Sequence, residues 1–393
     1  MQDRLSRSGH NQVIDQGSVS NQPASIAFVL PGVAAGGSEH VVSMLCDSFA
    51  ARGCRVTLAA FAEPGARPFY RLDPQVQFRA IGLSSDSTPT RRPLKSALRL
   101  LRLRRTLRDI QPDIVISFLT RTNILTLLAN PGVPVIVSER NNASMQPLPA
   151  IWAWLRRTLY PRASALVTMT AGAMNQLAKF APPVTRVIPN HASTLPARRA
   201  ALDGQSLVAV GRLVPQKGFD LLLPAFAKAA LDHPDWTLTI WGEGDERASL
   251  EAQRDALGLR ERVFLPGVTE TPGGWTTGAD LFVLSSRFEG WGLVVGEAMA
   301  AGIPTIAFDC EFGPAEMIRH DQSGLLVHAG DVDALATALG RLMGDEKSRR
   351  RLGAAGAQAM ERLSPQNIVQ QWFDLIGQFV AIPRCREEHR DAA

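Results

Sequence analysis

Short apolar runs alternate with stretches of helical periodicity along the whole chain, and this alternation constrains the fold more than any other feature. Strands are expected at 26–30, 55–61, 113–118, 133–138 and 165–170, and again at 207–210, 237–241, 263–265, 281–285 and 305–308. Strands that alternate with helices form parallel sheets with helices packed on them. Because 393 residues exceed what one hydrophobic core usually organises, two α/β domains are expected.

Composition sets the expected domain boundaries. Residues 1–24 are polar and lack an apolar stretch, which predicts a disordered tail and not a signal peptide. Domains are expected at 25–190 and 206–364, with a linker at 191–205 that contains Pro196 and Gly204. A last amphipathic helix is expected at 365–380 and a tail at 381–393. No segment approaches about 18 uninterrupted apolar residues, so the chain is not expected to span a membrane.

Two glutamates, Glu289 and Glu297, flank a glycine-rich turn that contains Gly290 and Gly292. The run before them is typical of a buried strand, and the run after them is typical of a helix. A helix that begins at such a turn offers free backbone N–H groups and a positive dipole end, which favour a bound phosphate. Carboxylates accept hydrogen bonds from neighbouring hydroxyls, so the segment indicates a phosphorylated sugar. The alternative is a pair of solvated helix charges.

A second turn of the same kind carries Arg212 and Lys217, between a strand-like run at 206–210 and an apolar helix. Arginine offers a planar fork to phosphate oxygens, and lysine offers a compact point charge. Two surface cations on a loop are the ordinary alternative. Two such turns in one half of the chain favour the phosphate interpretation.

Taken together, these segments resemble glycosyltransferase family 4, retaining nucleotide-sugar transferases of the GT-B architecture. The matching segments are Gly36-Gly37-Ser38-Glu39, Gly211-Arg212-Leu213 with Lys217-Gly218, Glu289 to Glu297, and Gly313-Pro314-Ala315-Glu316. The resemblance covers most of the chain. It implies an α/β fold of two Rossmann-like domains facing a central cleft, the first binding the acceptor and the second the nucleotide-sugar. It also implies that the helix at 365–380 crosses back to the first domain.

The resemblance assigns roles to individual residues. Arg212 and Lys217 match the clamp that neutralises the leaving diphosphate, Glu297 matches the residue on the ribose hydroxyls, and Glu289 matches the one facing the donor sugar. Of these, Glu289, Arg212 and Lys217 are expected to be catalytic. The other implied donor-binding positions are Gly36, Gly37, Val263, Gly292, Leu293 and Val294. No cofactor and no metal are implied. The departing phosphate oxygen would take the acceptor proton in a front-face displacement.

One departure from the family lies in the first domain, where many relatives carry a histidine after the fourth strand and residues 113–123 contain none. Thr120, Arg121 and Asn123 are candidates for acceptor-side contacts, although Asn123 is also placed to cap the following helix. Glu139 and Arg140 follow the next strand, at the edge where ligands bind in open sheets. Two histidines elsewhere, His40 and His191, are interpreted as structural or exposed.

Residues 91–108 hold eight Arg or Lys and no acid. At helical spacing Arg92, Lys95, Arg99 and Arg102 share one face, while Leu94, Ala97, Leu98 and Leu101 share another. Such a helix is typical of a membrane-surface or polyphosphate-binding element, which makes Lys95, Arg99 and Arg102 acceptor-side candidates; a solvated basic face is the alternative. An interfacial patch would be extended by a group of aromatic and basic residues, unless these pack inside: Trp152, Trp154, Arg156, Arg157 and Tyr160. No nucleic-acid recognition motif accompanies the charge.

The sequence therefore predicts a retaining glycosyltransferase, peripheral on the cytosolic face of the inner membrane. It would move a hexose or N-acetylhexosamine from a UDP-sugar, with GDP-mannose as the rival donor, to a lipid-linked saccharide in surface polysaccharide synthesis. Four cysteines without disulfide or metal spacing fit a cytosolic protein. A nucleotide-sugar 2-epimerase of similar architecture and an inactive nucleotide-binding scaffold are the alternatives. The first glycine-rich loop is not G-x-G-x-x-G, and an oxidoreductase would leave Arg212, Lys217, Glu289 and Glu297 without a role, which disfavours that class.

Overall fold

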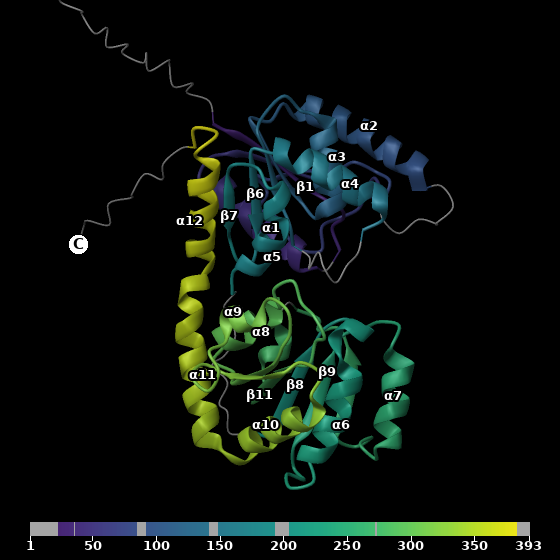
Figure 1. Ribbon diagram of the computed structural model, residues 1–393, viewed down its shortest axis with the longest axis vertical. Coiled ribbons are helices and arrows are strands. Elements are labelled where there is room, and N and C mark those ends of the chain that lie inside the picture. Colours follow the sequence, from purple (N-terminus) through teal and green to yellow (C-terminus); the bar gives the residue numbers. More distant parts are fainter. Residues whose placement is uncertain are drawn as a thin grey trace, which may run out of the picture.

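The computed structural model describes residues 23–34, 36–84, 92–140, 148–192, 204–271 and 273–382. Most of the two expected tails and of the expected linker lie outside these residues. The described residues contain no helix that is long and apolar enough to cross a bilayer. They form two α/β lobes, one above the other in Figure 1, with α11 (Glu346–Met360) and α12 (Pro365–Ile376) running along both.

The first domain is built on a seven-stranded parallel sheet of order β3-β2-β1-β4-β5-β6-β7. Its strands are β1 (Ser25–Leu30), β2 (Arg55–Ala60), β3 (Gln77–Ala80), β4 (Ile114–Phe118), β5 (Val135–Ser138), β6 (Ala165–Thr168) and β7 (Thr185–Val187). Its helices are α1 (Gly37–Ala51), α2 (Arg92–Ile110), α3 (Thr120–Ala129), α4 (Ala150–Leu159) and α5 (Ala171–Leu177). All residues of β1 are buried, as expected for a central strand covered on both faces.

The second domain repeats this design on a six-stranded parallel sheet of order β10-β9-β8-β11-β12-β13. Its strands are β8 (Ser206–Val210), β9 (Thr237–Trp241), β10 (Val263–Gly267), β11 (Leu281–Leu284), β12 (Thr305–Asp309) and β13 (Leu325–His328). Its helices are α6 (Phe219–Ala229), α7 (Arg247–Ala256), α8 (Leu293–Ala300), α9 (Pro314–Met317) and α10 (Val332–Gly344), followed by α11. The strand order reverses beside β1 in one sheet and beside β8 in the other, which makes a ligand-binding crevice at each switch point.

The predicted α/β class with two parallel sheets is confirmed, but three strands were not predicted. These are β3, β7 and β13, each of which lies at the edge of its sheet. An edge strand has one neighbour and needs no continuous apolar run, and β3 and β7 are largely exposed or half-buried.

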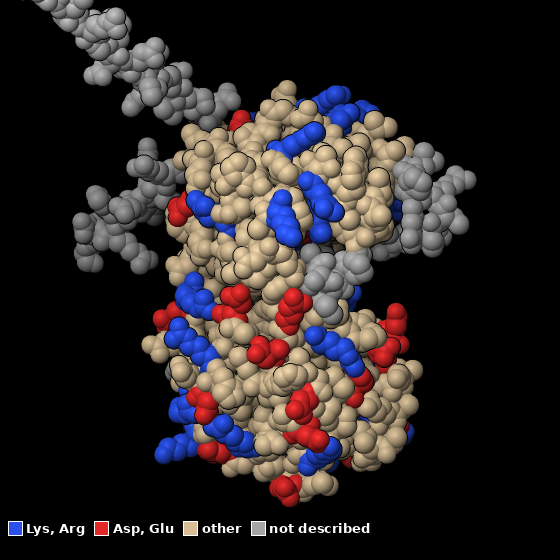
Figure 2. Space-filling model, in the orientation of Figure 1, with Lys and Arg blue, Asp and Glu red and all other residues tan. Residues whose placement is uncertain are grey.

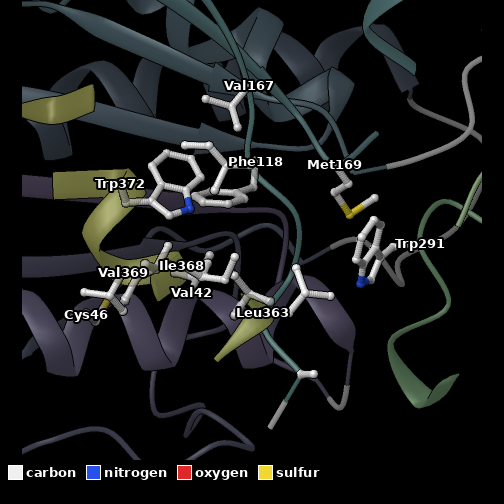
Figure 3. Packing of buried hydrophobic residues seen from close by; sticks show 14 of the residues in the cluster. Val42, Cys46, Phe118, Val167, Met169, Trp291, Leu363, Ile368, Val369 and Trp372 are labelled. Atoms are coloured by element: carbon white, nitrogen blue, oxygen red, sulfur yellow. The ribbon is translucent and has the colours of Figure 1, made fainter. Parts of the chain in front are cut away.

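Helix α12 belongs to the end of the chain but packs on the first domain. Its Phe373 ring stacks on Phe49 of α1 at 3.9 Å between centroids, and its Trp372 ring lies 5.9 Å from Phe118 at the end of β4. Trp372 is fully buried. Figure 3 shows Trp372 against Phe118, with Ile368 and Val369 on the same helix facing α1. The core of the first domain is therefore completed by residues from the far end of the chain.

The same apolar cluster continues across the boundary between the domains. Met169, which follows β6, lies beside Trp291 of the second domain (Figure 3), and both are almost fully buried. Trp275, Phe282 and Met360 belong to the same cluster. Because one continuous apolar cluster joins the two lobes, their contact is a packed interface as well as a crossing of the chain.

Replacing Trp372 by alanine removes the largest side chain that α12 buries in the first domain. We expect Trp372→Ala to lower the free energy of unfolding by about 3–5 kcal/mol, as for other large aromatic-to-alanine changes in cores. Urea denaturation measures the loss. Gln371→Ala on the exposed face of the same helix is the control and should stay close to wild type. Equal stability of the two variants would contradict the docking of α12.

Candidate active site

A cavity of about 580 Å³ lies where the strand ends of the two sheets face each other. The first domain contributes residues that follow β1, β2, β5, β6 and β7, and the second contributes residues that follow β8, β9, β10 and β11. Among the lining residues are the predicted Gly36, Gly37, Arg140, Arg212, Lys217, Glu289, Gly292, Leu293, Val294 and Glu297. Both domains thus form one site.

The two predicted phosphate-type turns meet directly inside this cavity. Lys217 Nζ donates to Glu289 Oε1 at 2.6 Å, and the Ser286 hydroxyl donates to the same oxygen at 2.7 Å. Both charged side chains are largely buried, with 15% and 8% of their surfaces exposed. Arg212, at the end of β8, lines the cavity and is exposed. The sequence places these residues on separate turns, and the structure brings them together.

The turns approach closely because a glycine stands at the point of contact. Gly218 has a φ of 65°, and a Cβ there would lie 2.1 Å from the Ser285 carbonyl oxygen. Any side chain would push the two turns apart and separate Lys217 from Glu289. Gly218 therefore determines the geometry of the ion pair.

Helix α8 directs its amino end into the cavity. Its N-cap residue, Gly292, is left-handed with a φ of 78°, and Leu293 and Val294 begin the helix. The first N–H groups of a helix have no intrahelical partner and carry partial positive charge. Opposite them, Gly37 begins α1, and a Cβ on Gly37 would contact Leu293 Cδ2 at 3.6 Å. Backbone from both domains is thus available to an anionic ligand.

Glu297 lies one turn further into α8 and is 8% exposed. Burial raises the pKa of this carboxyl from 4.5 to about 7, and a hydrogen bond from the Trp275 side chain opposes the shift. Trp275 lines the same cavity. None of the described residues forms an ion pair with Glu297, so no cation competes for its oxygens as hydrogen-bond acceptors.

Val263 does not line the cavity. It is fully buried in the core of the second domain, among residues of α6, α7 and β9. Val268, just beyond the end of the same strand, lines the cavity and is 61% exposed. The strand was correctly located, but the cavity lies at its carboxyl end, five residues beyond Val263.

Of the predicted acceptor-side residues, only Arg140 lines the cavity. Thr120 donates to Glu139 at 2.9 Å, the Tyr160 hydroxyl also donates to Glu139, and Asn123 donates to Ser138 O at 3.0 Å. All of these side chains are buried, so Thr120, Asn123 and Glu139 form an internal network behind the site. Tyr160 packs inside, which was the alternative to an interfacial role for this residue.

The apolar face predicted for the basic helix α2 does not pack on the core, as the alternative of a solvated basic face would require. Lys95 donates to Ser84 O at 2.7 Å, and Arg99 donates to Leu83 O through two nitrogens, so both hold the loop that precedes the helix. The core side of α2 is formed by Leu103 and Leu107, whereas Ala97, Leu98 and Leu101 are exposed. Arg102 is exposed, and the side chains of Arg92 and Leu94 lie outside the described residues. Arg121 lies over the Trp152 ring at 5.6 Å. Neither Arg121 nor the α2 cations Lys95, Arg99 and Arg102 line the cavity.

Several lining residues were not predicted to be functional. His40 lines the cavity, with its ring stacked on Tyr70 at 4.7 Å between centroids. His191 is buried behind it, 5.0 Å from the His40 ring, and its pKa is lowered to about 4 by burial and by His40 and Arg140. Phe69, which is 54% exposed, also lines the cavity. The position of His40, three residues after Gly37, was the one sequence signal available for this group.

Among the described residues, no group of three or more His, Cys, Asp or Glu side chains is arranged to hold a metal ion. Positive charge in the site comes from Arg212, Lys217, Arg140 and the amino end of α8.

Comparison with known proteins agrees with this geometry. Residues 36–191 match the family model described as a glycosyl transferase 4-like domain, and residues 196–359 match that of glycosyl transferases group 1. The Anabaena protein HepE, solved in complex with UDP-glucose, has the same fold with a TM-score of 0.73, 18% identity, and coverage of 90% of this chain and 100% of its own. Two facing domains of this kind define the GT-B architecture, and the chain belongs to glycosyltransferase family 4.

Two proteins with similar sequences match this chain over most of its length. An exopolysaccharide phosphotransferase of Streptomyces coelicolor is 32% identical over 93% of this chain, and the chain spans 42% of that relative. The Campylobacter jejuni GalNAc-alpha-(1->4)-GalNAc-alpha-(1->3)-diNAcBac-PP-undecaprenol alpha-1,4-N-acetyl-D-galactosaminyltransferase is 26% identical over 90% of this chain and 98% of its own length.

The raised pKa of Glu297 makes stability depend on pH. In the folded state its pKa lies above the ordinary 4.5, so its stabilising contribution is complete below pH 4.5 and is lost as the pH rises through 7. Glutamine does not ionise, so Glu297→Gln should gain up to about 3 kcal/mol relative to wild type between pH 4.5 and 8. Urea denaturation at both pH values measures the difference. Exposed Glu361→Gln is the control, and a constant difference for Glu297→Gln would contradict the assignment.

Proposed function

We propose that the protein is a retaining glycosyltransferase that moves a hexose or N-acetylhexosamine from a UDP-sugar to a lipid-linked saccharide in bacterial surface polysaccharide synthesis. The observation that carries the proposal is the buried Lys217–Glu289 pair, which shares one cavity with Arg212, Glu297 and the amino end of α8. Cations and free N–H groups suit a diphosphate, and buried carboxylates suit hydroxyls. A nucleotide diphosphate sugar presents both.

The chemistry follows from where charge develops. When the bond to the anomeric carbon breaks, the leaving diphosphate gains negative charge, which Arg212, Lys217 and the α8 N–H groups stabilise. The sugar gains positive charge, which the Glu289 carboxylate faces. The departing phosphate oxygen takes the proton of the attacking hydroxyl on the same face, so the anomeric configuration is retained and no protein base is needed. Because these groups already supply positive charge, we propose that transfer requires no divalent metal.

UDP is the favoured nucleotide, with GDP as the rival. HepE, which shares the fold, was solved with UDP-glucose, and this supports a uridine nucleotide. The name of the Campylobacter relative describes an undecaprenol diphosphate-linked acceptor and an N-acetylgalactosaminyl group. That name supports a lipid-linked saccharide as the acceptor here.

A lipid-linked acceptor calls for contact with a membrane, and the outer layer of the first domain offers a suitable surface. Helix α2 exposes Leu98 and Leu101, and α4 exposes Ile151 and Trp154, with exposed fractions of 41% to 60%. Arg102 and Arg105 lie one turn beyond Leu98 and Leu101, and both are exposed. Figure 2 shows basic side chains with few acids on the upper domain, whereas both signs mix on the lower one. We propose that α2 and α4 bind the cytosolic face of an anionic bilayer.

Nucleotide binding tests the site. Saturating UDP should stabilise the wild-type protein in the presence of EDTA, by about 2.7 kcal/mol at a hundredfold excess over Kd. Arg212→Ala and Lys217→Ala should lose this thermal shift because each removes a cation from the diphosphate. Lys228→Ala, a surface lysine paired with Asp333 outside the cavity, should keep it.

Turnover then separates the alternatives. Transfer to a lipid-linked saccharide with an unchanged anomeric configuration, read by NMR, supports the proposal. Conversion of the donor without acceptor indicates a 2-epimerase, and binding without turnover indicates an inactive scaffold. Folded wild-type protein that no nucleotide stabilises contradicts the diphosphate site altogether.

Membrane binding has its own test. The double variant Leu101→Glu, Trp154→Glu should lose at least tenfold in binding to phosphatidylglycerol-containing vesicles, because each change removes apolar burial and adds repulsion. Vesicle co-sedimentation measures this. Leu231→Glu replaces an 81% exposed leucine on the second domain and should bind like wild type. Equal vesicle binding by the wild type, the double variant and Leu231→Glu would contradict the proposal that α2 and α4 bind the membrane.

A further inference from the structure

Arg140 is the cation that the first domain places at the cavity, and it is only 6% exposed. It follows the end of β5, and its backbone presses against the turn that carries Glu289. A Cβ on Gly290 would lie 2.7 Å from the Arg140 carbonyl oxygen. Arg140 therefore lies against the turn of the second domain that we assign to the donor.

The guanidinium is held in place by neutral groups. Nε donates to the Ser138 hydroxyl at 2.9 Å, and Nη1 donates to Asn190 Oδ1 at 2.6 Å. The rings of Phe118 and Trp372 lie 5.1 and 5.6 Å away. The third nitrogen, Nη2, is buried and has no hydrogen-bond partner among the described residues.

No carboxylate of the described residues forms an ion pair with Arg140. The Glu139 side chain next to it in sequence bonds to Thr120 and Tyr160 instead, and the carboxylate of Glu289 is paired with Lys217. Burial lowers the pKa of Arg140 to about 9, so the group is still charged at neutral pH. A buried charge without a counter-ion destabilises the folded state, and a bound anion would offset that destabilisation.

A second buried arginine shows the contrast. Arg349 is 5% exposed and lies over the Trp236 ring at 5.2 Å, much as Arg140 lies near Trp372. Its Nη1, however, donates to the carbonyls of Leu342 and Met343 at the end of α10, where a helix dipole compensates the charge. Arg349 does not line the cavity. It is therefore a structural cation and a matched control.

We propose that Arg140 is a third cation of the phosphate site, supplied by the first domain, and that it stabilises a phosphate group bound in the cavity. The inference rests on the proposed function. Arg212 and Lys217 supply positive charge from one wall, and Arg140 supplies it from the other, so the phosphate links the two domains. The phosphate belongs either to the nucleotide donor or to a lipid-linked acceptor.

The test compares ligands with and without phosphate by calorimetry. Arg140→Gln should weaken UDP binding about ten- to hundredfold, the usual loss for a hydrogen bond to a charged group. Uridine, which lacks phosphate, should bind the variant and the wild type equally. Arg349→Gln should lower the thermal stability and leave the UDP affinity unchanged, which separates a structural role from a binding role.

A second arm identifies the source of the phosphate. If Arg140→Gln keeps its UDP affinity but, when saturated with UDP, loses affinity for geranyl diphosphate and not for geraniol, the phosphate is that of the acceptor. Unchanged affinity for both UDP and geranyl diphosphate overturns the inference, as does an equal loss for uridine. Wild-type protein that binds no UDP contradicts the proposed function itself, whereas normal wild-type binding with an unaffected variant contradicts the role of Arg140 alone.

Discussion

The common direction of the strands is the constraint on which the rest of the structure depends. Every strand in both sheets runs parallel to its neighbours, so the carboxyl ends of each sheet meet along one edge. The two edges face each other, and loops that leave both of them line one cavity. Parallel strands require crossover helices, and these bury the strands on both faces. A rigid scaffold thus supports a site made almost entirely of turns.

Within that frame, the charge of the site is distributed so that each group has a different environment. Lys217 and Glu289 neutralise each other at 2.6 Å. Glu297 is buried without a cation, which raises its pKa to about 7, and Arg140 is buried without an anion. Unmatched charges reduce the stability of a folded protein. Their position on facing walls of one cavity fits a ligand that carries both phosphates and hydroxyls.

The sequence predicted those elements whose structure depends on a short stretch of neighbouring residues. Central strands such as β1 are continuous apolar runs, and the turns at Arg212 and Glu289 are strand–turn–helix units, so both were predicted. The edge strands β3 and β7 were missed because they are largely exposed or half-buried and carry no continuous apolar run. The edge strand β13 was missed although Leu325–Val327 is an apolar run. Arg140 is held by Asn190 from 50 positions away, and no local pattern encodes that contact. For α2, periodicity separated two faces but could not show which one meets the core, because Leu103 and Leu107 decide it only after packing.

The docking of α12 has a consequence for synthesis of the protein. The chain enters the second domain between Ala192 and Gly204, and only after that domain does Trp372 arrive to fill the core of the first. Chains are made from the amino end, and domains usually fold in that order. Until α12 has been made, the first domain lacks the aromatic rings that pack on Phe49 and Phe118. That domain cannot complete its core until α12 has been made, so the whole second domain must be translated before the first lobe is finished.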